Sequence, residues 1–492
     1  MTGTLQIPPI DWALLGPFIQ LTAGAIVVTL MAVGPKAWRR YTGYVALLAL
    51  VPPAVATLGL WGGASGAAST LGGMIVMDRF TLCFHLIFLA TAALTVLISM
   101  PALEEMHLEY PEYYGLVLFA ATGMMLMSAS SNMLILFLGL EILSLPLYVL
   151  VGFARRQDRA LESSMKYFLL GAFSTGFTIY GMALMYGATG TLEMTRMAAG
   201  SGEGAGSWRF TMLMLGFGLA MAGFLFKIAA FPFHYWLPDV YQGAPTPVTA
   251  FMIAGTKAAA FSAILRIVTA PLFWDGPFTA DWVRLLSVLS ALTMTAGNVV
   301  ALVQHSLKRM LAYSSIAHAG YLLIAVVSRS EEGLAGVVFY LTAYLLMNLG
   351  AFAVVLAMDR ARGGEGEGDD IAAYAGMGRR HPALAAAMSI FMLSLTGVPL
   401  TGGFVGKFYI FRAAVDSGMY GLAAVGLLNS VVAAAYYLNV ILTMYMKEPV
   451  SQPPRVVTPV ALGLGIAVSA AGVLYLGLFP ARILELARGL LL

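Results

Sequence analysis

The sequence predicts an all-α polytopic membrane protein with about fourteen transmembrane helices. Three observations lead to this fold class. Charged residues make up only 10% of the 492 residues, against about 25% in soluble domains, and 60% of the chain is hydrophobic. The hydrophobic residues gather in blocks of about 20, the length that crosses a bilayer as a helix. Finally, 53 glycines and 22 prolines, many of them inside those blocks, are more typical of helices in lipid than of helices in water.

Glycine, proline and charged residues punctuate the chain and separate these blocks. The expected spans cover residues 12–33, 41–61, 80–100, 113–129, 132–153, 161–186, 209–231, 248–270, 282–303, 310–328, 333–358, 383–411, 419–446 and 456–480. The first block is a retained span rather than a signal peptide, because its basic residues, at positions 36–40, follow it. The boundary near residue 130 is the weakest, since no charge lies between Glu112 and Glu141, and thirteen spans would reverse half of the topology. We expect residues 1–492 to form a single membrane domain.

The distribution of basic residues predicts the orientation of the chain. Fourteen Lys and Arg residues lie in the connections after odd-numbered spans, and six lie on the other side. Cytoplasmic loops carry the excess of Lys and Arg. We therefore expect a multi-pass protein of the bacterial inner membrane with both termini on the periplasmic side.

Two polar stretches, 189–208 and 359–381, contain glycine-rich runs that are typical of flexible linkers. Neither follows a strand and opens a helix, so neither is a phosphate-binding loop. The net charge of +3 is too small and too scattered to indicate a nucleic-acid partner. Cys83 is the only cysteine, which leaves no set of thiolates for zinc or an iron–sulfur cluster. We expect no cofactor or metal site in this chain.

A small set of charged residues remains within or at the ends of the predicted spans: Glu141, Lys166, Lys227, Lys257, Arg266, Arg284, Lys407 and Arg412. A charge at the middle of a span costs ~2.5–3.5 kcal/mol, so it calls for a partner or for water. Glu141 and Lys257 lie ten residues into their blocks, too deep to reach the surface, although a structural ion pair is a second interpretation of Glu141. The arginines lie nearer block ends, where a side chain can reach the interface, and we expect structural roles for them. Lys166 is an intermediate case near the start of its block.

Lys227 and Lys407 share a special context. Pro232 follows Lys227 by five residues, and Pro399 stands among glycines before Lys407. Proline lacks a backbone donor, so spans 7 and 12 are predicted to be discontinuous near their lysines, with freed backbone groups that can bind water or ions.

The two predicted interruptions are five spans apart. This spacing predicts two five-helix repeats, spans 4–8 over residues 113–270 and spans 9–13 over residues 282–446. Because five is an odd number, the second repeat is inverted in the membrane. Residues 1–100 hold spans 1–3 before the repeats, and residues 456–480 hold span 14 after them.

Histidines add groups that titrate near neutral pH. His234 follows the first interruption, and His305 and His318 flank the basic and hydroxyl-rich segment 306–317. We expect these three to support proton transfer. The other histidines, His85, His107 and His381, are expected to be structural.

Four segments resemble the antiporter-like subunits of respiratory complex I. They are residues 139–148 (GLEILSLPLY), 226–241 (FKIAAFPFHYWLPDVY), 308–321 (KRMLAYSSIAHAGY) and 397–408 (GVPLTGGFVGKF). The last segment favours the N type of subunit, since the M type has a glutamate at the position of Lys407. The L type carries a further C-terminal lateral helix, and this chain stops about twelve residues past its last span.

The resemblance implies a subunit of NADH:quinone oxidoreductase, a proton-translocating enzyme, with fourteen helices in two inverted repeats. It implies that the chain lies in the lipid bilayer beside other membrane-arm subunits, namely the M type and small subunits. FMN, iron–sulfur clusters and quinone are implied in partner subunits, with no redox centre in this chain.

The resemblance also implies roles for single residues. Glu141 would pair with Lys227, Lys257 would relay protons, and Lys407 would be the lysine on the exit side. Burial favours the neutral form of an amine and a nearby carboxylate favours the charged form, so movement of Glu141 would switch Lys227 between holding and releasing a proton.

Two other functions stay open at this stage. A subunit of a multisubunit cation/proton antiporter would share the same Glu and Lys pattern. A non-pumping membrane scaffold would use the buried charges only to lock helices together.

Overall fold

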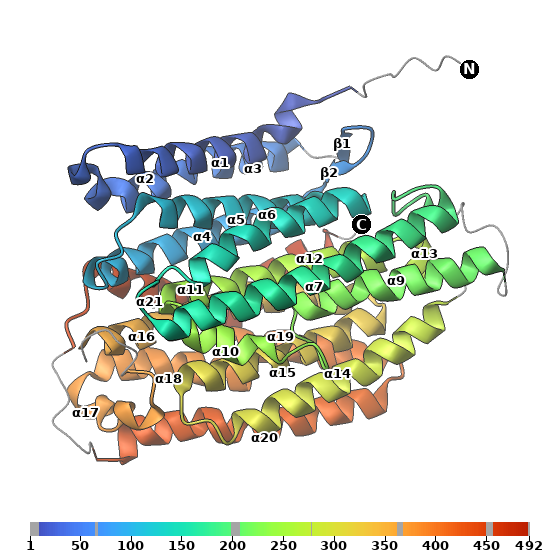
Figure 1. The fold of residues 1–492 in the computed structure, drawn as a ribbon. Coiled ribbons are helices and arrows are strands. Elements are labelled where there is room, and N and C mark those ends of the chain that lie inside the picture. The colour runs from blue at the N-terminus through green and yellow to red at the C-terminus, as the bar shows by residue number, and fades with distance from the viewer. Residues whose placement is uncertain are drawn as a thin grey trace.

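The computed structural model describes residues 9–63, 67–197, 207–276, 278–361, 368–448 and 456–490. Long helices run side by side in this part of the chain and form almost all of its regular structure (Figure 1). They are α1 (Trp12–Leu30), α2 (Thr42–Ala49), α3 (Val51–Gly63), α4 (Arg79–Glu105), α5 (Pro111–Ala129), α6 (Met133–Val151), α7 (Asp158–Thr189), α9 (Trp208–Lys227), α10 (Trp236–Gly243), α11 (Thr246–Phe251), α12 (Lys257–Val268), α13 (Pro271–Trp274), α14 (Thr279–Ala301), α15 (Leu307–Ser328), α16 (Glu331–Ala361), α17 (Met377–Arg380), α18 (Pro382–Thr396), α19 (Gly402–Asp416), α20 (Tyr420–Met446), α21 (Val460–Leu478) and α22 (Pro480–Arg488).

Shorter elements join these helices. Short 3₁₀ segments cover Met31–Val33, Lys36–Tyr41 and Ile371–Tyr374. Strands β1 (Ala68–Thr70) and β2 (Ile75–Met77) form an antiparallel hairpin in which Ala68 pairs with Met77. The sequence did not predict this hairpin, because each strand has only three residues.

Twelve helices in the described residues are long and apolar enough to cross a membrane. The fourth predicted span, α5, and the twelfth, which is divided between α18 and α19, are not among these twelve. The prediction of an all-α polytopic membrane protein is confirmed, whereas the count of fourteen spans and the two repeats remain predictions.

Both predicted interruptions are present. Helix α9 ends at Lys227 and α10 begins at Trp236, and the connection contains Pro232 and the positive φ of 56° at Ala229. Helix α18 ends at Thr396, where Gly397 adopts a φ of +93° that favours glycine.

A third irregularity was not predicted. Span 8 was expected to be continuous, but one π-helical segment, η3 (Met252–Thr256), lies between α11 and α12. Such segments are rare, and they are frequent at functional sites. Lys257 is the first residue after it.

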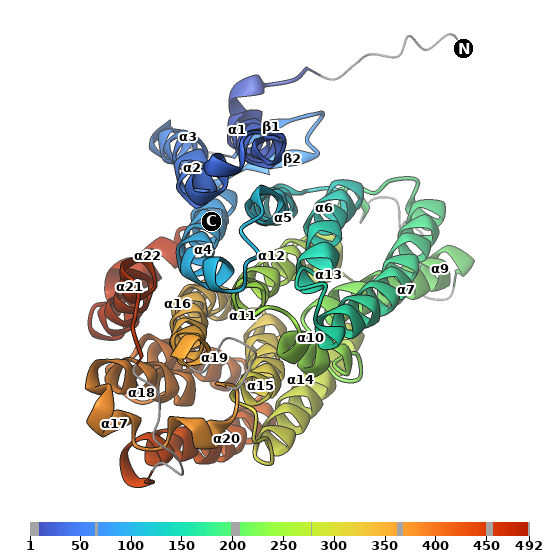
Figure 2. The same cartoon turned by 60° about the vertical axis from the view of Figure 1, so that its left-hand side comes forward.

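The helices form a buried centre and a lipid-facing periphery. In the apolar stretches of the α11–α12 span, α15 and α16, 100%, 94% and 89% of the residues are buried. In those of α7, α14, α20 and α21, 33% are buried. Figure 2 shows the first group in the interior and the second group around it. The elements that carry Lys257 and His318 are therefore the core of the molecule.

Glycines let several neighbouring helices approach closely. A Cβ on Gly181 of α7 would lie 2.5 Å from the backbone nitrogen of Ala220 in α9. A Cβ on Gly320 of α15 would lie 2.6 Å from the backbone nitrogen of Met294 in α14. Small residues at helix contacts are typical of membrane bundles, where dispersion contacts between helices provide much of the attraction.

The prediction of a flexible linker at 359–381 is wrong for residues 368–381. Asp369 accepts a hydrogen bond of 2.8 Å from the backbone nitrogen of Lys308, and Asp370 accepts one of 3.0 Å from the backbone nitrogen of Ala372. These two acidic residues thus accept hydrogen bonds at helix ends, with Asp369 buried and Asp370 exposed. In the stretch 189–208, residues 198–206 lie outside the described part of the chain, while Met194 and Met197 are buried.

Both ends of the described chain lie near the hairpin. The backbone nitrogen of Asp11, just before α1, donates to Oγ1 of Thr70 in β1 over 2.9 Å. A Cβ on Gly489, just after α22, would lie 3.9 Å from the guanidinium of Arg79, which follows β2 by two residues. The two ends therefore occupy the same side of the bundle, as an even number of spans requires.

Candidate functional site

The predicted site residues lie on five different helices. Glu141 is on α6, Lys227 ends α9, Lys257 begins α12, His318 is on α15 and Lys407 is on α19. The side chains of the three lysines and of His318 are buried, with exposed fractions of 5%, 1%, 4% and 1%. Within the described residues, none of these lysines takes part in an ion pair.

Lys227 lies in an aromatic box at the end of α9. Its Nζ donates a hydrogen bond of 3.3 Å to the hydroxyl of Tyr167. The same atom lies 5.1 Å from the ring centre of Tyr167 and 5.6 Å from that of Tyr148. Tyr167 stacks on Trp236 of α10 with 4.8 Å between ring centres. Aromatic faces attract a cation most strongly where water is excluded, so the box can hold an ammonium group without a carboxylate.

Glu141 is half-buried and accepts a hydrogen bond of 2.8 Å from the hydroxyl of Thr175 on α7. In the described part of the chain, this carboxylate forms no ion pair with Lys227. Tyr148, on the same helix as Glu141, lies over the ammonium instead. The direct pairing of Glu141 with Lys227 stays a prediction for another conformation.

Lys257 reaches α15 from the first turn of α12. Its Nζ donates to the backbone carbonyl of Ser315, and also to the hydroxyl of Ser315 over 2.6 Å. The ring centre of Tyr344, on α16, is 5.4 Å from this nitrogen. The π-helical segment before Lys257 shifts the helix register and gives this side chain its position at the centre of the bundle.

His318 joins three helices through hydroxyl groups. Its Nε2 lies 3.0 Å from the hydroxyl of Tyr437 on α20, and its Nδ1 hydrogen-bonds with the hydroxyl of Tyr340 on α16. The Tyr437 hydroxyl also hydrogen-bonds with Ser314, next to Ser315. Because a hydroxyl both donates and accepts, either nitrogen of the imidazole can carry the proton.

Lys407 is held by the interruption of its own span. Its Nζ donates to the carbonyls of Leu395 and Thr396 over 2.9 and 3.0 Å. These are the last carbonyls of α18, which have no partner within the helix. The negative end of the helix dipole adds to their attraction for a cation. The ring centre of Tyr321 lies 4.8 Å from the same nitrogen.

The contacts on α15 connect these groups in a row. Ser315 binds Lys257, Ser314 binds Tyr437, His318 binds Tyr437, and the ring of Tyr321 lies both over Lys407 and 5.6 Å from the ring of His318. We call Lys257, Ser314, Ser315, His318, Tyr321, Tyr437 and Lys407 the central row. Among the described residues, no direct hydrogen bond joins Lys227 to the central row; Tyr167, its hydrogen-bond partner, stacks on Trp236 of α10.

The tyrosines of this site were not predicted from the sequence. Tyr340 and Tyr344 occupy positions four apart on α16, and Tyr437 follows Tyr436 on α20. Each hydroxyl is far too polar to leave in hydrocarbon without a partner. The chain contains 22 tyrosines, and their places inside apolar blocks were the available signal.

The remaining predicted residues are placed as follows. Lys166 pairs with Glu162 at 2.6 Å and with Asp239 at 3.0 Å, at a partly exposed end of α7. His234 is buried in the first interruption, where its ring stacks 5.5 Å from that of Phe231, next to Pro232. His305 is exposed in the connection before α15, outside the central row, and Pro399 is exposed in the second interruption.

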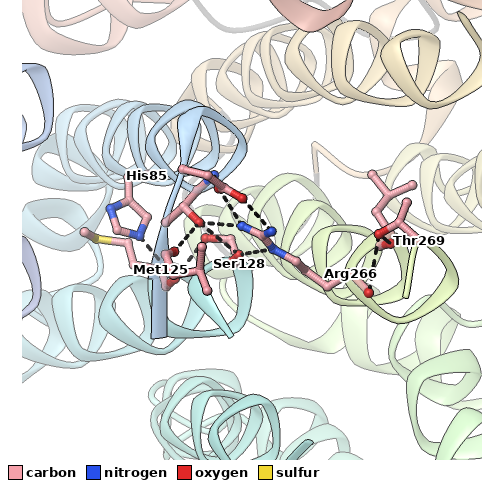
Figure 3. A network of polar contacts seen from close by, with 9 residues as sticks. His85, Met125, Ser128, Arg266 and Thr269 are labelled. Atoms are coloured by element: carbon pink, nitrogen blue, oxygen red, sulfur yellow. Dashed lines mark hydrogen bonds and ion pairs between the residues drawn. The ribbon is translucent and has the colours of Figure 1, made fainter. Parts of the chain in front are cut away.

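Arg266 makes a structural contact, as expected, but its guanidinium binds an acid instead of reaching the membrane interface. Its guanidinium binds both oxygens of Asp78 at 2.7 and 2.6 Å, and the carbonyl of Ser128 at 2.9 Å. Figure 3 shows Arg266 reaching from α12 to Ser128, with His85 of α4 beside Met125. Burial alone would raise the pKa of the Asp78 carboxyl, but Arg266 and the hydrogen bonds from Thr81 hold that pKa below its usual value.

The described residues contain no group of three His, Cys, Asp or Glu side chains that could hold a metal ion. Buried lysines at interrupted helices are instead typical of membrane proteins that move ions. The family described as "NADH:quinone oxidoreductase/Mrp antiporter, TM" matches residues 130–433, and the chain belongs to this family. The matched region includes Glu141, Lys227, Lys257 and Lys407.

Individual relatives are similar over almost the whole chain. NADH-quinone oxidoreductase subunit N of Trichlorobacter lovleyi is 46% identical over 456 residues, which cover 92% of this chain and 91% of the relative. NADH-quinone oxidoreductase subunit N 2 of Roseiflexus castenholzii is 41% identical over 502 residues, covering 99% and 98%. Among solved structures, a chain of respiratory complex I from Thermus thermophilus with bound aureothin is 35% identical, with a TM-score of 0.79 and coverage of 96% and 99%.

Proposed function

We propose that this chain is a proton-translocating subunit in the membrane arm of a bacterial NADH:quinone oxidoreductase. The observation that carries the proposal is the central row, in which hydrogen-bonded hydroxyls, an imidazole and the ring of Tyr321 lie between two buried lysines. The relatives named subunit N and the resemblance to a chain of complex I support it. Its partners are other membrane-arm subunits, namely the M type and small subunits, and FMN, iron–sulfur clusters and quinone belong to partner subunits.

The proton is first held at Lys227. When Glu141 leaves Thr175 and approaches Lys227, its charge favours the protonated amine. When Glu141 returns to Thr175, the ammonium keeps only the aromatic faces of the box as partners, and the buried site releases the proton more readily. The proton then passes through water to Lys257, with His234 and Lys166 near the start of this route.

From Lys257 the proton moves along the central row. Ser315 and Ser314 pass it to Tyr437 and His318 by exchange of hydrogen bonds. Lys407 receives it where two carbonyls stabilise its ammonium form, and releases it on the exit side. Each step transfers one proton between neighbouring groups, and each hydroxyl then rotates back before the next proton follows.

The chain needs an outside source of free energy. Moving one charge against ~100 mV costs ~2.3 kcal/mol. Reduction of quinone in partner subunits supplies this energy, and movement at the subunit contacts carries it to Glu141, whose side chain is half-buried on α6.

The same proposal includes the topology expected from the sequence. The side rich in Lys and Arg faces the cytoplasm, so the hairpin and both ends of the described chain face the periplasm. Residues 113–270 and 282–446 form two inverted five-helix repeats, one for each interrupted span.

The test measures coupled quinone reduction and proton pumping in membrane vesicles that carry the assembled enzyme. Lys227→Ala and Glu141→Ala should depress both, and Glu141→Asp should be milder because it keeps the charge. Lys447→Ala is the control, since Lys447 is exposed just after α20. Undiminished pumping by a stably assembled Lys227→Ala enzyme contradicts the proposal.

A second candidate is a subunit of a multisubunit cation/proton antiporter, because the family description also includes the Mrp antiporter. Transport that depends on sodium in vesicles would favour it. A non-pumping scaffold is the third candidate, and mutants that lose assembly rather than activity would favour it. The scaffold is disfavoured because three buried lysines without acid partners are a costly way to hold helices together.

A further inference from the structure

Two buried amides lie beside the end of the central row that holds Lys407. Asn298 is on α14 and Asn429 is on α20, and these two helices pack against each other and against α15 (Figure 2). Asn298 is fully buried, and Asn429 is 7% exposed. Amides in the apolar interior of a membrane protein are costly unless their polar atoms are hydrogen-bonded. The partners of these two amides therefore indicate what the amides do.

The amide of Asn298 is engaged at every polar atom. Its Nδ2 donates to the hydroxyl oxygen of Tyr321 over 2.9 Å and to Oδ1 of Asn429 over 3.1 Å. Its Oδ1 accepts a hydrogen bond of 2.9 Å from the hydroxyl of Tyr436. An amide has two hydrogens to donate, and both are used here. The side chain of Asn298 thus has one defined orientation between α15 and α20.

The donor and acceptor roles of these amides are set by groups around them. Nδ2 of Asn429 donates over 3.0 Å to the backbone carbonyl of Val425, and a carbonyl can only accept. The same nitrogen lies 3.1 Å from Oγ1 of Thr295, whose own hydrogen is bound within α14. Asn429 must therefore turn its oxygen toward Asn298, and Asn298 must turn its nitrogen toward Asn429. It follows that the hydroxyl oxygen of Tyr321 accepts the second hydrogen of this nitrogen.

This hydrogen bond fixes the ring of Tyr321, which belongs to the central row. The ring centre lies 4.8 Å from Nζ of Lys407 and 5.6 Å from the ring of His318. A ring attracts a cation that lies over its face, so the attraction depends on how the ring is tilted. Ser430 of α20 is a second polar group beside the Tyr321 hydroxyl. A serine hydroxyl rotates and both donates and accepts, whereas the amide of Asn298 allows one arrangement.

We propose that Asn298 is a positioning residue for the transfer of the proton to Lys407 and that it acts through Tyr321. The amide keeps the face of the Tyr321 ring toward Lys407. This position stabilises the ammonium form and lets the lysine take up the proton from the end of the row at His318. Asn429 sets the orientation of the Asn298 amide. The inference rests on the proposed function, since it concerns how the last lysine of the central row receives its proton.

The test measures proton pumping by the assembled enzyme in membrane vesicles. Asn298→Ala should lower pumping about threefold to tenfold, the effect of weakening one buried contact between a cation and a ring. Tyr321→Phe keeps the ring but loses the hydroxyl that Asn298 binds, and it should lower pumping by a similar factor. The double variant should pump no more slowly than either single variant, because both changes remove the same contact. A merely structural role of Asn298 would give independent losses that multiply.

Ser290→Ala is the matched control on the same helix. Ser290 is fully buried on α14 and donates a hydrogen bond of 2.7 Å to the backbone carbonyl of Gly320, the residue before Tyr321. This variant loses a hydrogen bond between the same two helices but leaves the Tyr321 hydroxyl in place. We expect lower thermal stability in detergent and normal pumping.

Asn298→Asp tests the donor role at nearly constant size. A carboxyl group offers at most one hydrogen in place of two, so Tyr321 and Asn429 compete for it, and pumping should again fall by about threefold or more. If Asn298→Ala does not assemble, Asn298→Asp and Tyr321→Phe decide the case.

Three results would each overturn the positioning role of Asn298. They are normal pumping by Asn298→Asp or Tyr321→Phe, multiplied losses in the double variant, and a loss of pumping in Ser290→Ala as large as in Asn298→Ala. None of them touches the proposed function, which is contradicted by undiminished pumping of the assembled Lys227→Ala enzyme.

Discussion

Removal of one hydroxyl, in Tyr437→Phe, tests the central row most directly. The hydroxyl of Tyr437 hydrogen-bonds with Ser314 and with Nε2 of His318, so it is the atom that joins Lys257's side of the row to the imidazole. The ring itself packs against Tyr436, 4.4 Å away, and this packing remains in the variant. Two hydrogen bonds at about 0.6–1 kcal/mol each amount to about 1.4 kcal/mol, or roughly tenfold in rate. We expect pumping by the assembled enzyme to fall by about that factor.

The control for this prediction is a buried tyrosine outside the central row. Tyr113→Phe, on α5, removes a hydroxyl that hydrogen-bonds with Ser99 over 2.9 Å. The two variants should lose similar thermal stability in detergent, while only Tyr437→Phe should pump slowly. Equal pumping by both variants, or equal loss by both, would refute the reasoning that the Tyr437 hydroxyl carries protons.

Two further predictions concern stability. The Asp78–Arg266 pair adds stability that is complete above the unfolded-state pKa of about 3.9 and is lost as pH falls through the lower folded-state pKa. Asp78→Asn should therefore lower the free energy of unfolding at pH 7 by about 3 kcal/mol, and this loss should shrink below about pH 4. A loss of stability that is the same at all pH values would contradict this. Gly320→Ala should destabilise the α14–α15 contact by about 1–3 kcal/mol, because its Cβ would lie 2.6 Å from backbone. Gly421→Ala, where a Cβ meets nothing within 4 Å, should leave the melting temperature unchanged or slightly raised.

The sequence predicts the fold class and the interruptions because both depend on local chemistry. Pro232 lacks a backbone donor wherever it stands, and Gly397 tolerates a φ of +93° that other residues avoid. Likewise, Lys257 is costly in any apolar block. Such features need no knowledge of which helices are neighbours.

The sequence could not predict the partners of these residues, because partners depend on helix packing. Asp78 and Arg266 are 188 positions apart, and Ser314 and Tyr437 are 123 apart. Nothing in the local pattern joins them. The π-helical segment at Met252–Thr256 was also missed, since the one glycine within it, Gly255, does not distinguish a π-helical turn from an α-helical one.

Asp369 shows a different kind of miss. The acidic and glycine-rich run from 363 to 370 has the composition of a solvated linker, and composition alone indicates no fixed position for it. In the structure Asp369 instead accepts hydrogen bonds from Ser306 and from the backbone of Lys308 at the start of α15. Capping is a contact between segments, so the position of Asp369 depends on where α15 lies.

The hydrogen bonds between α18 and Lys407 couple the position of the two half-helices to the charge of the lysine. The carbonyls of Leu395 and Thr396 are free because the span is interrupted, and they hold the ammonium of α19 only while the two half-helices stay in register. By thermodynamic reciprocity, a push that separates the half-helices weakens proton binding, and loss of the proton loosens the half-helices. A neighbouring chain that displaces α18 would therefore weaken proton binding at Lys407 without contacting that residue.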